Sequence, residues 1–186
     1  MNARFTIVLV VLLVLVGGLV GVTQVLRSSD KDIERADRLY RVSSSELSDV
    51  TISQDEEKIT FVHLDEKWYI KDEEQGENLP VNIDRWGGIP SLLGGPAVST
   101  NLSESEEELG DRASYGIEPP RSRINLISFN GQGIEVNIGD LTPTQDGYYA
   151  QVTGSEILYI VHSSWVDVLM RLLTEPPYPL EEATAR

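Results

Sequence analysis

The sequence predicts an α+β fold, in which an N-terminal transmembrane helix precedes a β-meander-rich domain with two helices. Three observations predict this class. The run from Phe5 to Leu26 is apolar and free of charge. From Val42 onward, short stretches of alternating apolar and polar residues are separated by turn-forming residues, as expected for antiparallel strands. Two further stretches, each with a tryptophan near its start, carry apolar residues at helical spacing.

The apolar run is long enough to cross a bilayer. It holds 22 residues, and a helix of that length spans about 33 Å, against about 30 Å for the hydrocarbon core. A cleaved secretory signal is the alternative, but its apolar core usually has about 7–15 residues and ends in a small-x-small cleavage site. This run is longer, and its end lacks that pattern. We therefore expect residues 1–27 to be a transmembrane anchor that contacts the lipid bilayer through Phe5 to Leu26.

Composition excludes several classes of function. The chain holds 30 acidic and 15 basic residues, for a formal net charge of −15. A nucleic-acid-binding protein needs a basic face, and none is visible, so we expect no nucleic acid among the partners. The chain has no cysteine, which excludes disulfides, thiolate metal sites and a cysteine nucleophile. The domain is therefore expected to be stabilised by packing alone.

A charged connector, residues 28–41, follows the anchor. In two places an acidic residue precedes an arginine by four positions, the order that stabilises helices: Glu34 with Arg38, and Asp37 with Arg41. We expect the membrane helix to continue into this stretch as a stalk. The soluble α+β domain then occupies residues 42–174, and a proline-rich, extended tail occupies residues 175–186.

In the first half of the domain, alternation predicts strands over 49–54, 59–64 and 67–71, joined by acidic turns. An acidic loop from Asp72 to Asn78 follows. Asn82 then caps a helix that Gly87, Gly88 and Pro90 make short or kinked; its apolar residues are Ile83, Trp86, Leu92 and Leu93. A strand over 97–102 and an acidic segment over 103–110 complete this half. The acidic segment lacks the spacing of an EF-hand calcium site, so a solvated loop or helical turn is the expectation.

The second half has the same outline. We expect strands over 123–129, 133–139, 147–152 and 157–161, with a hairpin turn at Asn130-Gly131. Ser164 then caps a helix, with Asp167 as a capping-box-like partner, and its apolar face is Trp165, Val168, Leu169, Leu172 and Leu173. A duplicated β-β-β-α unit is one interpretation of this order. The identities of the two halves do not align well enough to establish a repeat.

An ordered set of segments resembles the bacterial family named domain of unknown function 4340. The segments are Lys67-Trp68-Tyr69-Ile70, the helix around Trp86, Tyr115-Gly116-Ile117-Glu118-Pro119-Pro120, Ile138-Gly139-Asp140, Gly147-Tyr148-Tyr149-Ala150 and Ile157-Leu158-Tyr159-Ile160-Val161. The resemblance covers roughly residues 39–173. It implies a membrane-anchored domain outside the cytoplasm, near components of ABC-type export or gliding-type transport. It implies no catalytic residue.

Two arguments about the orientation of the chain in the membrane oppose each other. A count of basic residues favours a cytoplasmic domain, because only Arg4 precedes the run and five cations follow it. Those cations alternate with acidic residues, however, and a four-residue N-terminus is easily retained inside, as in signal anchors. Together with the family resemblance, this predicts a single-pass protein of the cell membrane with its soluble domain on the extracytoplasmic side.

No catalytic constellation is visible in the sequence. His63 and His162 are the only histidines, and neither has the Ser-His-Asp order or the metal-ligand spacing that would support a role as general base or ligand. The paired carboxylates lie in turns, where water solvates them. We therefore expect the protein not to be an enzyme, with no catalytic, cofactor-binding or metal-binding residue and no cofactor.

The expected function is that of a non-catalytic, membrane-anchored extracytoplasmic interaction module, an accessory component of an ABC-type transporter or envelope assembly with a membrane-protein partner. Two alternatives stay open: a small single-span accessory subunit of a larger, unrelated membrane complex, or a ligand-binding domain. Short strands leave edges that can accept a partner strand. Aromatic rings are suited to an interface, although some belong to the core: Trp68, Tyr69, Tyr148, Tyr149 and Tyr159. All three tryptophans are expected to be largely buried.

Overall fold

The computed structural model describes residues 37–72, 76–104 and 111–179. The predicted anchor (residues 1–27), the first part of the predicted stalk and residues 180–186 lie outside the described residues. Within the described ranges, no helix is both long and apolar enough to cross a membrane.

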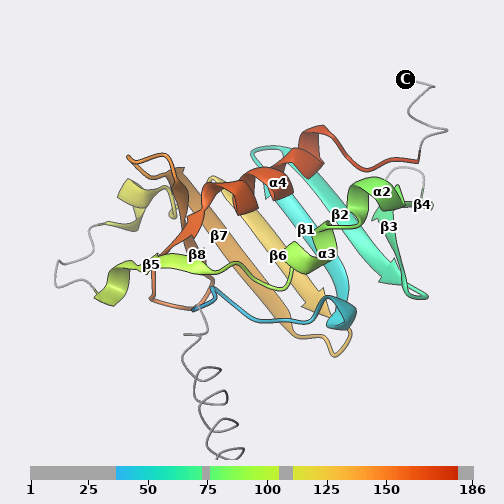
Figure 1. Cartoon of the computed structure of the whole chain (residues 1–186), viewed down its shortest axis with the longest axis horizontal. Coiled ribbons are helices and arrows are strands. Elements are labelled where there is room, and N and C mark those ends of the chain that lie inside the picture. Colours follow the sequence, from blue (N-terminus) through green and yellow to red (C-terminus); the bar gives the residue numbers. More distant parts are fainter. Residues whose placement is uncertain (1–36, 73–75, 105–110, 180–186) are drawn as a thin grey trace, which may run out of the picture. The chain divides into compact units, whose positions relative to one another are not determined.

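Nine strands form a single antiparallel sheet, in the order β4-β3-β2-β1-β6-β7-β8-β9-β5 (Figure 1). The strands are β1 (Leu47–Gln54), β2 (Glu57–Leu64), β3 (Lys67–Lys71), β4 (Asn78–Pro80), β5 (Val98–Asn101), β6 (Ser122–Ser128), β7 (Gly133–Leu141), β8 (Gly147–Val152) and β9 (Tyr159–His162). The helices are α2 (Ile83–Trp86), α3 (Ile89–Leu92) and α4 (Ser163–Thr174), with short 3-10 helices η1 (Ser44–Glu46), η2 (Leu102–Glu104) and η3 (Arg112–Tyr115).

The strand order is symmetric about the centre of the sheet. β1 and β6 pair there; β2, β3 and β4 follow outward on one side, and β7, β8 and β9 on the other. Helices come after β4 and after β9. The predicted α+β class, with a large antiparallel sheet, is confirmed. Four strands precede each helical region. The sequence predicted four strands in the second half but three in the first, because it assigned the chain from Asn78 to Pro80, which forms β4, to the end of a loop and to no strand.

Strand register separates an apolar face from a polar face. On one face Phe61, Val50, Leu126 and Ile134 form a row across four neighbouring strands, and the first three are at most 1% exposed. Successive side chains of a strand point to opposite faces. The adjacent row, on the other face, is accordingly polar: it consists of Thr60, Thr51, Asn125 and Glu135.

The helices cover the apolar face. Trp165 Nε1, on α4, donates a hydrogen bond to the carbonyl oxygen of Leu92, on α3, at 2.9 Å. The ring of Trp86, on α2, lies 4.4 Å from that of Phe61 and 5.4 Å from that of Trp68. Figure 1 shows the three helices in front of the strands. The predicted burial of the three tryptophans is confirmed, since their exposed fractions are 4–9%.

Both predicted helices differ in detail from their sequence-based bounds. The first is divided into the single turns α2 and α3 by Gly87 and Gly88, and Asn82 caps it as predicted, with Oδ1 accepting from the backbone N–H groups of Asp84 and Arg85. The cap predicted at Ser164 is wrong.

His162 is the N-cap of α4. Its Nδ1 accepts a hydrogen bond from the Ser164 N–H at 3.2 Å. Asp167 makes no capping box, and its carboxylate instead accepts a hydrogen bond from the Tyr148 hydroxyl at 3.1 Å.

The chain just before η1 belongs to the folded domain. Leu39 and Tyr40 are buried, and the Leu39 N–H donates to the carbonyl oxygen of Pro96 at 3.1 Å. Arg38 also forms a β-bridge with Ala97, directly before β5. The last residues of the predicted stalk therefore pack on the domain in extended form, because Leu39 and Tyr40 gain more from burial than a solvated helix would give them.

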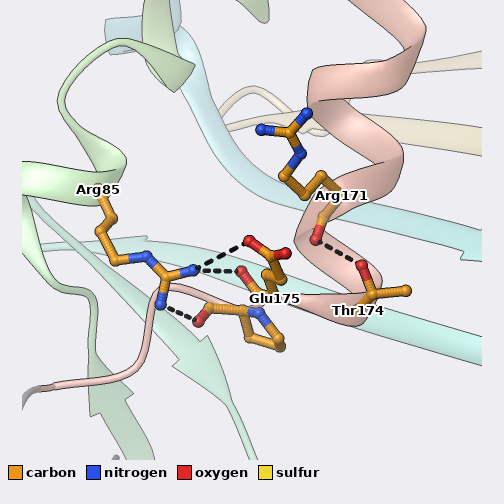
Figure 2. A network of polar contacts seen from close by, with 5 residues as sticks. Arg85, Arg171, Thr174 and Glu175 are labelled. Carbon is orange, nitrogen blue, oxygen red and sulfur yellow. Dashed lines mark hydrogen bonds and ion pairs between the residues drawn. The ribbon is translucent and has the colours of Figure 1, made fainter.

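Arg85 holds the chain that leaves α4. Figure 2 shows its guanidinium donating to the carbonyl oxygens of Glu175, at 2.9 Å, and of Pro176, at 3.0 Å, with the Glu175 carboxylate 4.0 Å away. The Asn82 N–H also donates to the carbonyl oxygen of Pro177 at 2.8 Å. The start of the proline-rich tail is therefore fixed against α2, next to the edge strand β4.

Candidate interaction surface

His63 lies in a stack of aromatic rings at the end of β2. Its Nδ1–H donates to the carbonyl oxygen of Leu47 at 3.0 Å. Its ring stacks on Trp68, with centroids 4.7 Å apart and planes 4° apart, and the ring of Phe129 lies 5.7 Å away on a tilt of 45°. Together with the Trp68–Trp86 contact, the stack runs from the surface into the core. These contacts give His63 a packing role.

His162 lies apart from His63, at the start of α4. Its Nδ1 lies 2.8 Å from Ser164 Oγ, but the same nitrogen accepts the Ser164 N–H, which is the geometry of a helix cap. The nearby Asp146 is hydrogen-bonded by Thr144 Oγ1 at 2.6 Å and by Thr142 Oγ1 at 3.1 Å, and these bonds lower the pKa of its carboxyl. Within the described part of the chain, no cluster of three or more metal-ligating side chains is present.

Three large apolar side chains are exposed at one end of the central strands. Asp49 on β1 pairs with Val62 on one side and with Ile127 on the other, which places these residues in one row. Leu64 lies two positions after Val62, at the end of β2. Phe129 directly follows the last residue of β6. Their exposed fractions are 47% for Leu64, 37% for Ile127 and 62% for Phe129. Because successive side chains alternate between faces, Leu64 and Ile127 belong to the polar face, whereas Phe129 packs on His63, on the apolar face. We call this end of the sheet, with these three exposed residues and His63, the hairpin-end surface.

A cavity of about 760 Å³ adjoins the hairpin-end surface. It lies between the segment that leads into β1 and the β6–β7 hairpin; its lining includes Arg41, Val42, Glu46, Phe129, Asn130 and Gln132. The Phe129 N–H donates to the carbonyl oxygen of Glu46 at 2.9 Å, which joins the two walls. The cavity therefore lies close to where the described chain begins.

The aromatic residues singled out from the sequence contribute less to this surface. Trp68 is buried, and Tyr69, Tyr148, Tyr149 and Tyr159 are half-buried. Burial, together with the hydrogen bond to Asp167, raises the pKa of the Tyr148 hydroxyl. Sequence analysis missed Phe129 and Leu64. A signal existed for Phe129, because it directly precedes the Asn130-Gly131 turn, where an apolar side chain has little core to enter.

The edges of the sheet offer little to a partner strand. β4 has three residues and ends at Pro80, which has no N–H to donate. β5 has four residues, and the Asp37 carbonyl oxygen accepts the N–H of its first residue, Val98, at 2.8 Å. These short, partly covered edges favour side-chain contacts over strand addition as the means of binding.

Comparison with known proteins gives no match: no family model matches the chain, and no curated protein and no solved structure matches it significantly. The resemblance to the domain of unknown function 4340 family stays a prediction.

Proposed function

We propose that the protein is a non-catalytic, membrane-anchored extracytoplasmic interaction module that binds a membrane protein through the hairpin-end surface. The observation that carries this proposal is the 62% exposed ring of Phe129, which packs on His63 at the end of the sheet where Leu64 and Ile127 are also exposed. Aromatic side chains that rest on a rigid support contribute a large share of the energy of protein interfaces. Phe129 has such a support in His63 and Trp68.

Chain connectivity favours a partner in the same membrane. If Phe5 to Leu26 is the anchor, only 14 residues separate it from Arg41, which lines the cavity beside the hairpin-end surface. A chain of that length reaches at most about 50 Å. The surface would thus stay within reach of the extracytoplasmic part of a neighbouring membrane protein.

The charge of the chain favours a basic partner. At a net charge of −15, long-range attraction would speed association with a positively charged surface and disfavour anionic lipid headgroups. The family resemblance points to an ABC-type transporter or envelope assembly as the partner complex. A single-span subunit of an unrelated complex is the alternative, and the genes adjacent to this one would distinguish the two.

Affinity purification of the full chain from native membranes, in a mild detergent, tests the proposal. We expect a membrane protein to co-purify, and we expect Phe129→Ser and Leu64→Ser to reduce its recovery at least tenfold, the loss typical of a buried interface anchor. Leu141→Ser is the matched control, because Leu141 is 37% exposed but ends β7, at the opposite end of that strand from the β6–β7 hairpin. Equal recovery with all three variants would show that the partner binds elsewhere.

A further inference from the structure

A second cavity, of about 700 Å³, lies on the polar face of the sheet in its second half. Its floor is formed by Asn137 on β7 and Gln151 on β8, which are directly paired. The walls come from Arg112 on η3, from Glu118 and from the β8–β9 loop, including Thr153 and Ser155. This volume lies in the range of about 300–1,000 Å³ usual for small-molecule sites.

Two buried polar atoms of the lining residues have no hydrogen-bond partner among the described residues: Arg112 Nη1 and Asn137 Oδ1. The other groups of these two side chains are engaged. Arg112 Nη2 donates to the carbonyl oxygen of Glu156, and Asn137 Nδ2 lies 3.4 Å from Thr153 Oγ1. Leaving a buried donor and a buried acceptor unpaired is costly. A ligand that both accepts and donates hydrogen bonds would satisfy them.

The lining restricts the chemistry of such a ligand. Arg112 is the only basic residue among those that line the cavity, and Glu118 and Glu156 oppose it, so an anion would gain little. Ile157 is the only residue of the lining with an apolar side chain, which disfavours an apolar ligand. The rest are amide and hydroxyl side chains, or glycine. Hydroxyl groups, which donate and accept at once, fit this set of partners.

We propose that this cavity binds a neutral, hydroxyl-rich ligand, a saccharide, with hydroxyl groups held by Arg112 Nη1 and Asn137 Oδ1. Gln151 is 8% exposed, and its Nε2 is held by the carbonyl oxygen of Ser155 at 2.7 Å, so the floor is ordered before the ligand binds. The site is independent of the hairpin-end surface, which lies at the ends of β2 and β6.

Saturation-transfer NMR on the full chain tests the proposal, in a zwitterionic detergent because maltoside headgroups are themselves saccharides. The probes are maltose, cellobiose and N,N′-diacetylchitobiose, with glucuronate as the anionic comparison. We expect transfer from at least one neutral disaccharide. We expect Arg112→Lys, which keeps the charge but loses the forked nitrogens, and Asn137→Ala to weaken it about tenfold or more.

Gln132→Ala is the control, because it lines the first cavity only. Gln132→Ala and Phe129→Ser should both leave saccharide binding unchanged. A failure of the saccharide proposal can therefore be distinguished from a failure of the proposed partner surface. Circular dichroism of each variant identifies any loss of folding. The inference is overturned if no neutral disaccharide gives transfer at tens of millimolar, if glucuronate binds more tightly than all of them, or if folded Arg112→Lys and Asn137→Ala bind as the parent does.

Discussion

Replacing Gly139 by alanine should detach a segment of chain from the polar face of the sheet. A Cβ at this position would lie 2.0 Å from the carbonyl oxygen of Tyr115 and 3.2 Å from the backbone of Gly116. The obstacle is backbone, which moves less readily than the end of a side chain. This backbone carries Ile117, which is fully buried, and Tyr115, whose ring lies 4.9 Å from that of Tyr149.

The expected cost of Gly139→Ala is about 3 kcal/mol in the free energy of unfolding, at the upper end of the range of about 1–3 kcal/mol for overpacking. In a domain of this size that lowers Tm by about 10 °C. Gly133 offers a control in the same strand, since its nearest neighbour would be the Leu126 carbonyl oxygen at 3.9 Å, an ordinary contact. Gly133→Ala should therefore change stability by less than about 1 kcal/mol.

Urea unfolding of a fragment from Asp30 to Pro179, followed by tryptophan fluorescence, measures both variants. The fragment keeps the contacts between Arg85 and the chain after α4. Hydrogen exchange should show protection lost over residues 112–117 in Gly139→Ala but not in Gly133→Ala. Equal stability of the two variants would refute the close contact between η3 and β7.

Four further substitutions test the core and the loops. Tyr40→Phe should be neutral or stabilise the domain by about 1 kcal/mol, because the buried Tyr40 hydroxyl has no partner among the described residues and burial raises its pKa. Tyr148→Phe loses the hydrogen bond to Asp167 and should instead destabilise the domain by about 1 kcal/mol in the same urea assay. Trp165→Ala should cost about 3–5 kcal/mol, and a loss below about 1 kcal/mol would place this ring outside the core. Hydrogen bonds from Thr144 and Thr142 lower the pKa of the Asp146 carboxyl from 3.8, so the stability that this carboxylate contributes is present above that pH and is lost as the pH falls below it. Asp146→Asn should therefore lose less stability than the parent as the pH falls through this range. Identical profiles of unfolding free energy against pH for the two proteins would contradict this prediction.

The sequence carried enough information to place most strands, and physical reasons explain the misses. β1 alternates clearly because one face is buried and the other is polar. β4 was missed because Leu79 is its only apolar residue and Pro80 is a weak strand former. The cap at His162 was missed because histidine is an unusual N-cap. No local pattern reveals that β5 pairs with β9, since that contact joins distant parts of the chain.

The candidate surface was harder to predict than the fold. Tyrosines favour interfaces in general, but here Tyr149 faces Tyr115 and Tyr148 bonds to Asp167, so burial and tertiary contacts engage them. Phe129 and Leu64 come to the same end of the sheet only because β6 and β2 flank β1, a consequence of long-range register. The cavity that includes Arg112 and Asn137 likewise depends on η3 lying over β7.

Site-specific photocrosslinking in native membranes tests the proposed function most directly. A photoreactive amino acid is placed at Phe129 in one variant of the full chain and at Leu141, at the far end of β7, in another. The proposal predicts a discrete crosslink to a membrane protein from Phe129 and none from Leu141. No crosslink from Phe129, or the same products from both positions, would contradict binding through the hairpin-end surface.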